Sequence, residues 1–197
     1  MADKTIFATI DRNDLAALSC LLADTNIEHY DEDTPLIYAV RCGNWRAFEL
    51  ILATTHVDLD FITTAGETAL IVAVRAKNAL NFRDKIVYFS MVQALIMAGA
   101  NCNIADFYED SPLTIAATYN DRETTKLLIE YNENLSYRNK ALDNACYYGH
   151  IEIVRLLIGT GMIIDMDTNI VTSMFVNSNV RDHIIKILSD AECAQIN

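Results

Sequence analysis

Basic residues are scarce in this chain. Lysine and arginine number 15 against 27 aspartate and glutamate residues, which gives a net charge of -12 at pH 7 over 197 residues. Sequence-independent binding to nucleic acid or to an anionic membrane needs clustered cations, so the composition excludes both classes of partner. An acidic chain of this kind favours solubility and a partner that offers a basic patch.

Long apolar segments are also missing. No uninterrupted run of 18 apolar residues occurs, so we predict no membrane-spanning segment. No apolar stretch of signal-peptide length follows the first residues, and we therefore expect a cytoplasmic protein. The apolar share is still 52%, which suffices for a buried core in one compact domain or one short repeat array.

The chain lacks the residue patterns of metal and catalytic sites. Its five cysteines are widely spaced and never form a Cys-x-x-Cys pair, which indicates free thiols in a reducing compartment. The four histidines have no metal-ligand spacing, and no glycine-rich phosphate loop, Gly-x-Ser-x-Gly or His-Glu-x-x-His motif occurs. We therefore predict no metal, no cofactor and no enzymatic activity.

Glycine and proline are few, at 6 and 2 residues, and their positions follow an internal repeat of about 33 residues. Each repeat can be aligned on a three-residue anchor. The anchors are Thr34-Pro35-Leu36, Thr68-Ala69-Leu70, Ser111-Pro112-Leu113 and, in a weaker form, Lys140-Ala141-Leu142. In the regular repeats, a pair of apolar residues follows 17 and 18 positions after the first anchor residue, at 51–52, 128–129 and 157–158.

The segment 149–158 closely resembles the second helix of an ankyrin repeat, and the anchors resemble the Thr-Pro-Leu-His motif of that family. The resemblance implies an all-α ankyrin-repeat solenoid of stacked helix-turn-helix units with β-turn fingers. We predict a single domain, 1–197, with about six repeats, of which the terminal ones are degenerate. The expected boundaries are 1–30, 31–63, 64–106, 107–136, 137–167 and 168–197, with the last repeat anchored near Val171.

The helix breakers agree with this register. Gly43 and Gly149 lie nine residues after an anchor, where the first helix must turn into the second. Gly66 lies at the tip of a finger, and Gly99 and Gly161 close second helices, where a left-handed residue is favoured. A proline opens the first helix in the second and fourth repeats, and a Thr or Ser precedes it as the predicted cap.

Three departures from the family pattern are visible. The histidine of the anchor motif is replaced by Ile37, Ile71, Thr114 and Asp143. The finger at 132–139 is shortened. An insertion at about 76–88 separates the helices of the third repeat; we interpret it chiefly as a tolerated surface loop, with an extension of the second helix and a second contact site as alternatives.

In the ankyrin family, partner contacts come chiefly from the fingers and the exposed side of the first helices, which form a concave face. Tyr30, Asp31 and Tyr137 fall on predicted fingers, whereas Tyr147 and Tyr148 fall on a predicted first helix. The resemblance implies this partner-binding set: Tyr30, Asp31, Asp33, Arg41, Glu67, Arg75, Phe107, Tyr108, Asp110, Tyr119, Tyr137, Tyr147 and Tyr148.

Six of the nine tyrosines fall in this set, and acidic residues surround them. Tyrosine offers a large amphipathic contact area at low entropic cost and is common at interface hot spots. We therefore predict an aromatic-acidic groove that receives a basic or amphipathic segment of another protein. The alternatives are a merely soluble acidic surface and rings that only cover neighbouring fingers.

These features predict a monomeric, non-catalytic interaction module that acts as an adaptor or an inhibitor. His150, at the start of a second helix, is predicted to be structural. One alternative is an effector-type protein that acts on a host cell. A small-molecule binder or enzyme is the other, and it requires a closed pocket with converging polar groups near Asp143.

Overall fold

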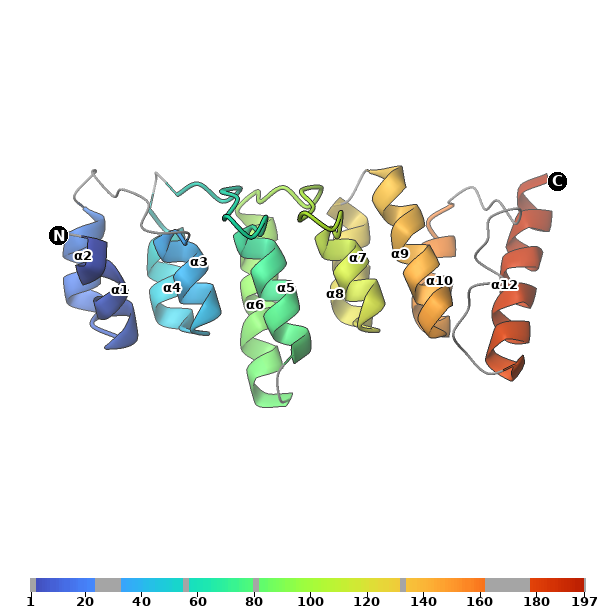
Figure 1. Cartoon of the computed structure of the whole chain (residues 1–197), viewed down its shortest axis with the longest axis horizontal. Helices are drawn as coiled ribbons and strands as arrows, with labels where there is room; N and C mark the ends of the chain where they lie inside the picture. The colour runs from blue at the N-terminus through green and yellow to red at the C-terminus, as the bar shows by residue number, and fades with distance from the viewer. Residues whose placement is uncertain are drawn as a thin grey trace. The chain divides into compact units, whose positions relative to one another are not determined.

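The computed structural model describes residues 3–23, 33–54, 57–79, 82–131, 134–161 and 178–196, and these residues form helices, turns and loops without a strand (Figure 1). The predicted all-α class is confirmed. The chain separates into two compact units, Met1–Glu109 and Asp110–Asn197. The assignment of all 197 residues to a single domain stays a prediction.

The first unit consists of three helix pairs. Within each pair the two helices pack against each other, and the pairs stack so that α1 contacts α3 and α3 contacts α5, while α2 contacts α4 and α4 contacts α6. The helices are α1 (Asp3–Asp11), α2 (Leu15–Leu22), α3 (Pro35–Arg41), α4 (Trp45–Leu52), α5 (Ala69–Ala79) and α6 (Phe82–Met97).

The second unit repeats this stacking. Here α7 contacts α9, α8 contacts α10, and α10 contacts the last helix, α12. The helices are α7 (Pro112–Thr118), α8 (Arg122–Tyr131), α9 (Leu135–Tyr148), α10 (Ile151–Ile158) and α12 (Ser178–Ile196). The predicted anchor near Val171, like Tyr30 and Asp31, lies outside the described residues.

One backbone turn recurs between the two helices of a pair. Its central residue is left-handed at Asn13, Gly43, Asn120 and Gly149, with φ of 54°, 63°, 57° and 77°. The amide of the following residue donates to the carbonyl five residues back, as from Asn44 to Ala39 at 3.0 Å. These bonds satisfy carbonyls at the end of the first helix, so the turn both ends one helix and begins the next.

The helices begin at side-chain caps. In the turn, Asp14, Asn44 and Asp121 each accept a hydrogen bond from an amide in the first turn of the second helix, at 3.1 to 3.2 Å. At the anchors, Thr34 and Ser111 do the same for helices that start with proline, at 3.2 Å in both. The predicted caps are confirmed, and they satisfy helix donors that would otherwise lack partners.

The core follows the paired apolar positions. The first member of each regular pair (Ile51, Leu128 and Leu157) is at most 2% exposed, and the second member is half-buried. In α12, Ile184 and Leu188 are buried as well, which is how this helix packs against α10. Each pair of helices therefore buries its apolar stripe against its neighbours, as expected of a stacked repeat.

The described residues of the insertion in the third repeat are helical, so its interpretation as a surface loop is wrong. Residues 76–79 lie in α5 and residues 82–88 in α6, which makes these two helices longer than those of the second repeat. Tyr88 is 5% exposed and packs over the turn at Gly43, where a Cβ atom would lie 3.0 Å from its hydroxyl oxygen. A ring anchored on the preceding repeat explains why these residues stay helical.

The structure also differs from the prediction of a shortened finger at 132–139. Helix α9 begins at Leu135, where the Asn134 side chain accepts from the Ser136 amide at 2.9 Å. The chain therefore enters the helix well before Lys140, the predicted anchor. Tyr137 lies within this helix, and its assignment to a finger is wrong.

Candidate partner-binding surfaces

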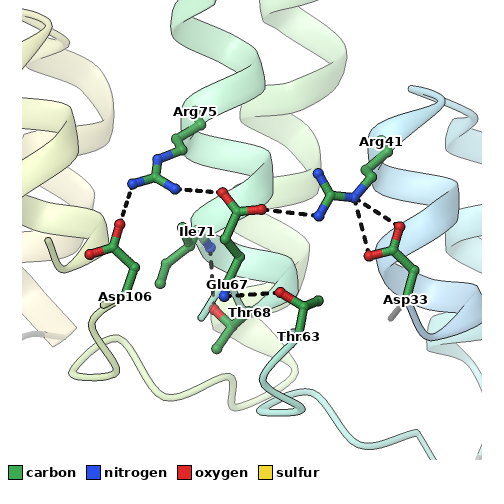
Figure 2. A network of polar contacts seen from close by, with 8 residues as sticks. All are labelled: Asp33, Arg41, Thr63, Glu67, Thr68, Ile71, Arg75 and Asp106. Carbon is green, nitrogen blue, oxygen red and sulfur yellow. Dashed lines mark hydrogen bonds and ion pairs between the residues drawn. The ribbon is translucent and has the colours of Figure 1, made fainter. Parts of the chain in front are cut away.

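A ladder of ion pairs crosses the finger side of the first unit (Figure 2). Arg41 on α3 donates from Nε to Asp33 at 2.9 Å and from Nη2 to Glu67 at 3.0 Å. Glu67 accepts from Arg75 on α5 at 2.5 Å, and Arg75 also pairs with Asp106. Negative and positive side chains thus alternate along this series. We call Asp33, Arg41, Glu67, Arg75 and Asp106 the ion-pair ladder.

The finger at residues 63–67 holds the centre of the ladder in place. The Thr63 carbonyl accepts from the Gly66 amide at 2.8 Å, and the Thr63 hydroxyl accepts from the Glu67 amide at 3.1 Å. The Glu67 side chain is 13% exposed and bridges both arginines. These backbone hydrogen bonds hold the finger that presents the Glu67 carboxylate between the two arginines.

Both guanidinium groups respond to this environment. Partial burial by itself lowers the pKa of Arg41, but its hydrogen bonds and charge contacts with Asp33 and Glu67 outweigh burial and raise the pKa. Arg75 behaves in the same way, with partial burial opposed by Glu67 and Asp106. Both arginines therefore stay charged at any physiological pH.

The ladder engages four residues of the predicted partner-binding set with one another. It also includes Asp106, a fully buried carboxylate that the sequence reasoning missed. A signal was present, since Asp106 lies five residues before its anchor at 111 just as Thr63 lies five before 68. Asp106 shapes its own finger too, because its side chain accepts from the Tyr108 amide at 2.8 Å.

Phe107 and Tyr108, also predicted residues of the first unit, are largely exposed, at 71% and 78%. One face of the Phe107 ring covers Gly66, where a Cβ atom would lie 2.9 Å from the ring. The idea that some rings cover neighbouring fingers is thus correct for Phe107, although most of this side chain still faces solvent.

In the second unit, Tyr119, Tyr147 and Tyr148 are exposed at 59%, 38% and 50%. We call these three residues the aromatic platform. The rings of Tyr147 and Tyr148 meet edge to face at 4.9 Å, and Tyr148 stacks on His150 at 5.9 Å. Such contacts restrain the rings while leaving much of their area open to solvent.

Thr118, the last residue of α7, connects the ends of α7 and α9. Its hydroxyl accepts from the Asn144 amide group at 2.8 Å, and its carbonyl lies 2.9 Å from Nε2 of His150. A carbonyl only accepts, so Nε2 carries the hydrogen and donates. His150 makes no side-chain cap to its own helix, and this contact confirms the predicted structural role. Tyr119, next to Thr118, is thereby held beside the end of α9.

Two carboxylates lie near this region. Asp110 forms an ion pair with Lys140 at 3.2 Å. Asp143, on α9, is exposed, which contradicts the closed pocket that a small-molecule site would require there. Partial desolvation nevertheless raises the pKa of Asp143.

Other kinds of site were sought in the described part of the chain. There, no three His, Cys, Asp or Glu side chains gather in a group that could hold a metal ion. None of the helices described is long and apolar enough to cross a membrane.

Comparison with protein families identifies the fold. The family model "Ankyrin repeats (3 copies)" matches residues 6–87 and again residues 83–170, which together span most of the chain. The chain belongs to the ankyrin repeat family. Ankyrin repeats generally serve as protein–protein interaction modules and are generally not catalytic. The number of repeats, predicted as about six, is not fixed by this match.

Two named proteins are similar to this chain over part of their own length. A fowlpox virus (strain NVSL) protein named for its ankyrin repeats is 29% identical over 147 residues, covering 70% of this chain and 40% of the viral protein. The neurogenic locus notch homolog protein 1 of Xenopus laevis is 27% identical over 125 residues, covering 64% of this chain and 5% of that protein. The chain thus spans less than half the length of these relatives.

Proposed function

We propose that this ankyrin protein is a non-catalytic binding module that captures a protein partner through its fingers and first helices, with the aromatic platform as the main anchor. The observation that carries the proposal is the exposure of Tyr119, Tyr147 and Tyr148 at the ends of two adjoining first helices. Tyrosines so placed have the character of interface hot spots.

The core between α7 and α9 consists of other residues. Ala117 on α7 and Ala145 and Cys146 on α9 are fully buried, and the two helices contact each other. Exposed rings of this size leave apolar area in water, and a partner that covers them gains about 25 cal/mol per Å² of that area. This gain supports a binding role over a structural one.

In the first unit, the ladder satisfies its charged members internally, so we assign the partner contacts there chiefly to Phe107 and Tyr108. Asp33, Arg41, Glu67 and Arg75 then act by fixing the fingers that present these rings. The remaining members of the sequence-derived set complete the proposed surface: Tyr30, Asp31, Asp110 and Tyr137.

The partner is expected to offer a basic or amphipathic segment. The net charge of -12 favours a basic partner at the encounter stage, since opposite charges accelerate association at low ionic strength. We propose that the chain acts as a cytoplasmic monomer, to be checked by light scattering of the purified protein.

The test is an affinity capture from source cells with a triple variant, Tyr119→Ala, Tyr147→Ala and Tyr148→Ala. We expect the partner to be lost, because truncating a central aromatic commonly costs about 2 kcal/mol of binding. Tyr131→Ala is the matched control, since Tyr131 is also 49% exposed in the second unit but lies on the second helix α8. Undiminished capture by the triple variant, with a native helical circular dichroism spectrum, would refute the platform as anchor.

Stoichiometry separates the two forms of the proposal. A one-to-one complex in which the partner loses its own activity supports an inhibitor. Simultaneous binding of two different proteins supports an adaptor.

A further inference from the structure

The chemistry of the aromatic platform narrows the class of partner. Helices α7 and α9 both end beside it, at Thr118 and Tyr148, and Thr118 joins the two ends by its contacts with α9 and His150. The last carbonyls of a helix carry partial negative charge, which a cation stabilises. Neither α7 nor α9 has a basic residue in its last turn, so the helices themselves do not supply that cation.

Asp143 adds a full negative charge close by. It precedes Tyr147 by one helical turn on α9, and residues four apart share one face of a helix. Its carboxylate is partly desolvated, and the ion pair that Lys140 forms among the described residues is with Asp110. Asp143 and the rings of Tyr147 and Tyr148 therefore lie within the last two turns of α9, and the end of α7 is joined to this part of α9 through Thr118.

These three features favour the same ligand. Tyrosine rings attract a cation to their faces, and a guanidinium does this better than an ammonium because it is planar and weakly hydrated. A guanidinium also donates several hydrogen bonds in a fixed plane, which suits a carboxylate at the edge of a ring.

We propose that the aromatic platform, with Asp143, binds an arginine side chain in the basic segment of the partner. The guanidinium lies over the rings of Tyr147 or Tyr148 and donates to the Asp143 carboxylate. Tyr119 covers the aliphatic part of the side chain from the end of α7. This inference rests on the proposed function and specifies the chemistry that the platform recognises.

The probe is a pair of peptides, acetyl-Gly-Gly-Arg-Gly-Gly-amide and the same peptide with citrulline, titrated into the full chain. Citrulline keeps the shape of arginine but has no charge. Ring carbon–proton NMR signals of the tyrosines report binding. We expect the arginine peptide to shift the signals of Tyr119, Tyr147 and Tyr148 and to bind about tenfold more tightly than the citrulline peptide.

Substitutions assign the interaction to the named groups. Asp143→Asn should weaken the arginine peptide about fivefold and leave the citrulline peptide unchanged, because only the charged ligand senses the carboxylate. The double variant Tyr147→Phe and Tyr148→Phe keeps the ring faces and should bind the arginine peptide as the natural protein does. The double variant Tyr147→Ala and Tyr148→Ala should not bind this peptide. Glu152→Gln, an exposed carboxylate on α10, is the control for a general charge effect.

Equal affinity for the two peptides, or an equal loss with Glu152→Gln and Asp143→Asn, would overturn the arginine site. That failure is distinct from failure of the proposed function. If the triple alanine variant loses the natural partner while the arginine and citrulline peptides bind alike, the platform is a binding surface that recognises something other than arginine.

Discussion

At the scale of single residues, the Asp143 carboxyl makes the stability of the fold depend on pH. It stands at an anchor position that the family fills with histidine, on a half-exposed part of α9 where desolvation raises its pKa. The folded protein therefore holds this proton more tightly than the unfolded chain. Protons bound preferentially by the folded state make stability fall as the pH rises through the window between the two pKa values.

We predict that Asp143→Asn is more stable than the natural protein at pH 7. The unfolded carboxyl titrates near its ordinary value of 3.8 and the folded one above it, so the ionised carboxylate destabilises the fold only above this window. Denaturant unfolding at pH 7 and at about pH 3, where both forms are uncharged at this position, measures the difference. The advantage of the variant should vanish at the lower pH. A less stable variant at pH 7 would mean that a cation already pairs with the carboxylate.

The left-handed turn residues show what the sequence does and does not reveal at this scale. Gly43 and Gly149 were placed correctly from their spacing, because glycine accepts positive φ without strain. Asn13 and Asn120 occupy the same turn position and were not identified, although asparagine is the side chain that next most readily adopts it. Glu109 adopts the conformation of Gly66 in the next finger, at φ of 60°, and no sequence rule points to glutamate there.

At the scale of elements, the insertion in the third repeat lengthens two helices. Its sequence spacing was compatible with a helix, but local pattern does not reveal that Tyr88 contacts Gly43, a residue of the preceding repeat. The Tyr88 hydroxyl also lies 3.4 Å from the Arg41 carbonyl. A contact of this kind is made between repeats and becomes visible only when both are placed.

We predict that Tyr88→Ala destabilises the first unit by about 3 kcal/mol, the usual cost of removing a buried ring. Tyr88→Phe keeps the ring and removes the hydroxyl, whose hydrogen bond to the Arg41 carbonyl is long, so it should cost less than about 1 kcal/mol. Urea unfolding followed by the fluorescence of Trp45, which lies in this unit, measures both. Equal and small effects would show that Tyr88 merely lines the surface.

At the scale of the whole molecule, the excess of negative charge does not prevent charged side chains from stabilising the fold locally. The chain carries an excess of acidic residues, yet the ladder places two arginines between three carboxylates across the repeats of the first unit. Alternating charges joined in a network contribute more than isolated surface pairs do. The ladder thus stabilises the stacking of repeats while the rest of the surface keeps its negative potential.

We predict that Glu67→Gln lowers the stability of the first unit by about 1–2 kcal/mol, because both arginines lose their shared carboxylate. The loss should shrink as NaCl rises, since salt screens the partly exposed pairs of the natural protein. Glu49→Gln, an exposed carboxylate on α4, is the control and should change stability by less than about 0.5 kcal/mol. An equal loss in both variants, independent of salt, would exclude a specific role for the ladder.

The sequence by itself determined the family, the register of the regular repeats, their caps and most of their turns. These features depend on local backbone preferences and on the spacing of apolar residues, and both can be recognised in the sequence alone. Only the tertiary structure decided that Arg41, Glu67 and Arg75 bind one another, that Tyr137 belongs to a helix, and that Thr118 joins the ends of α7 and α9. The ladder and the junction at Thr118 each depend on groups about 30 residues apart, which meet only when successive repeats stack.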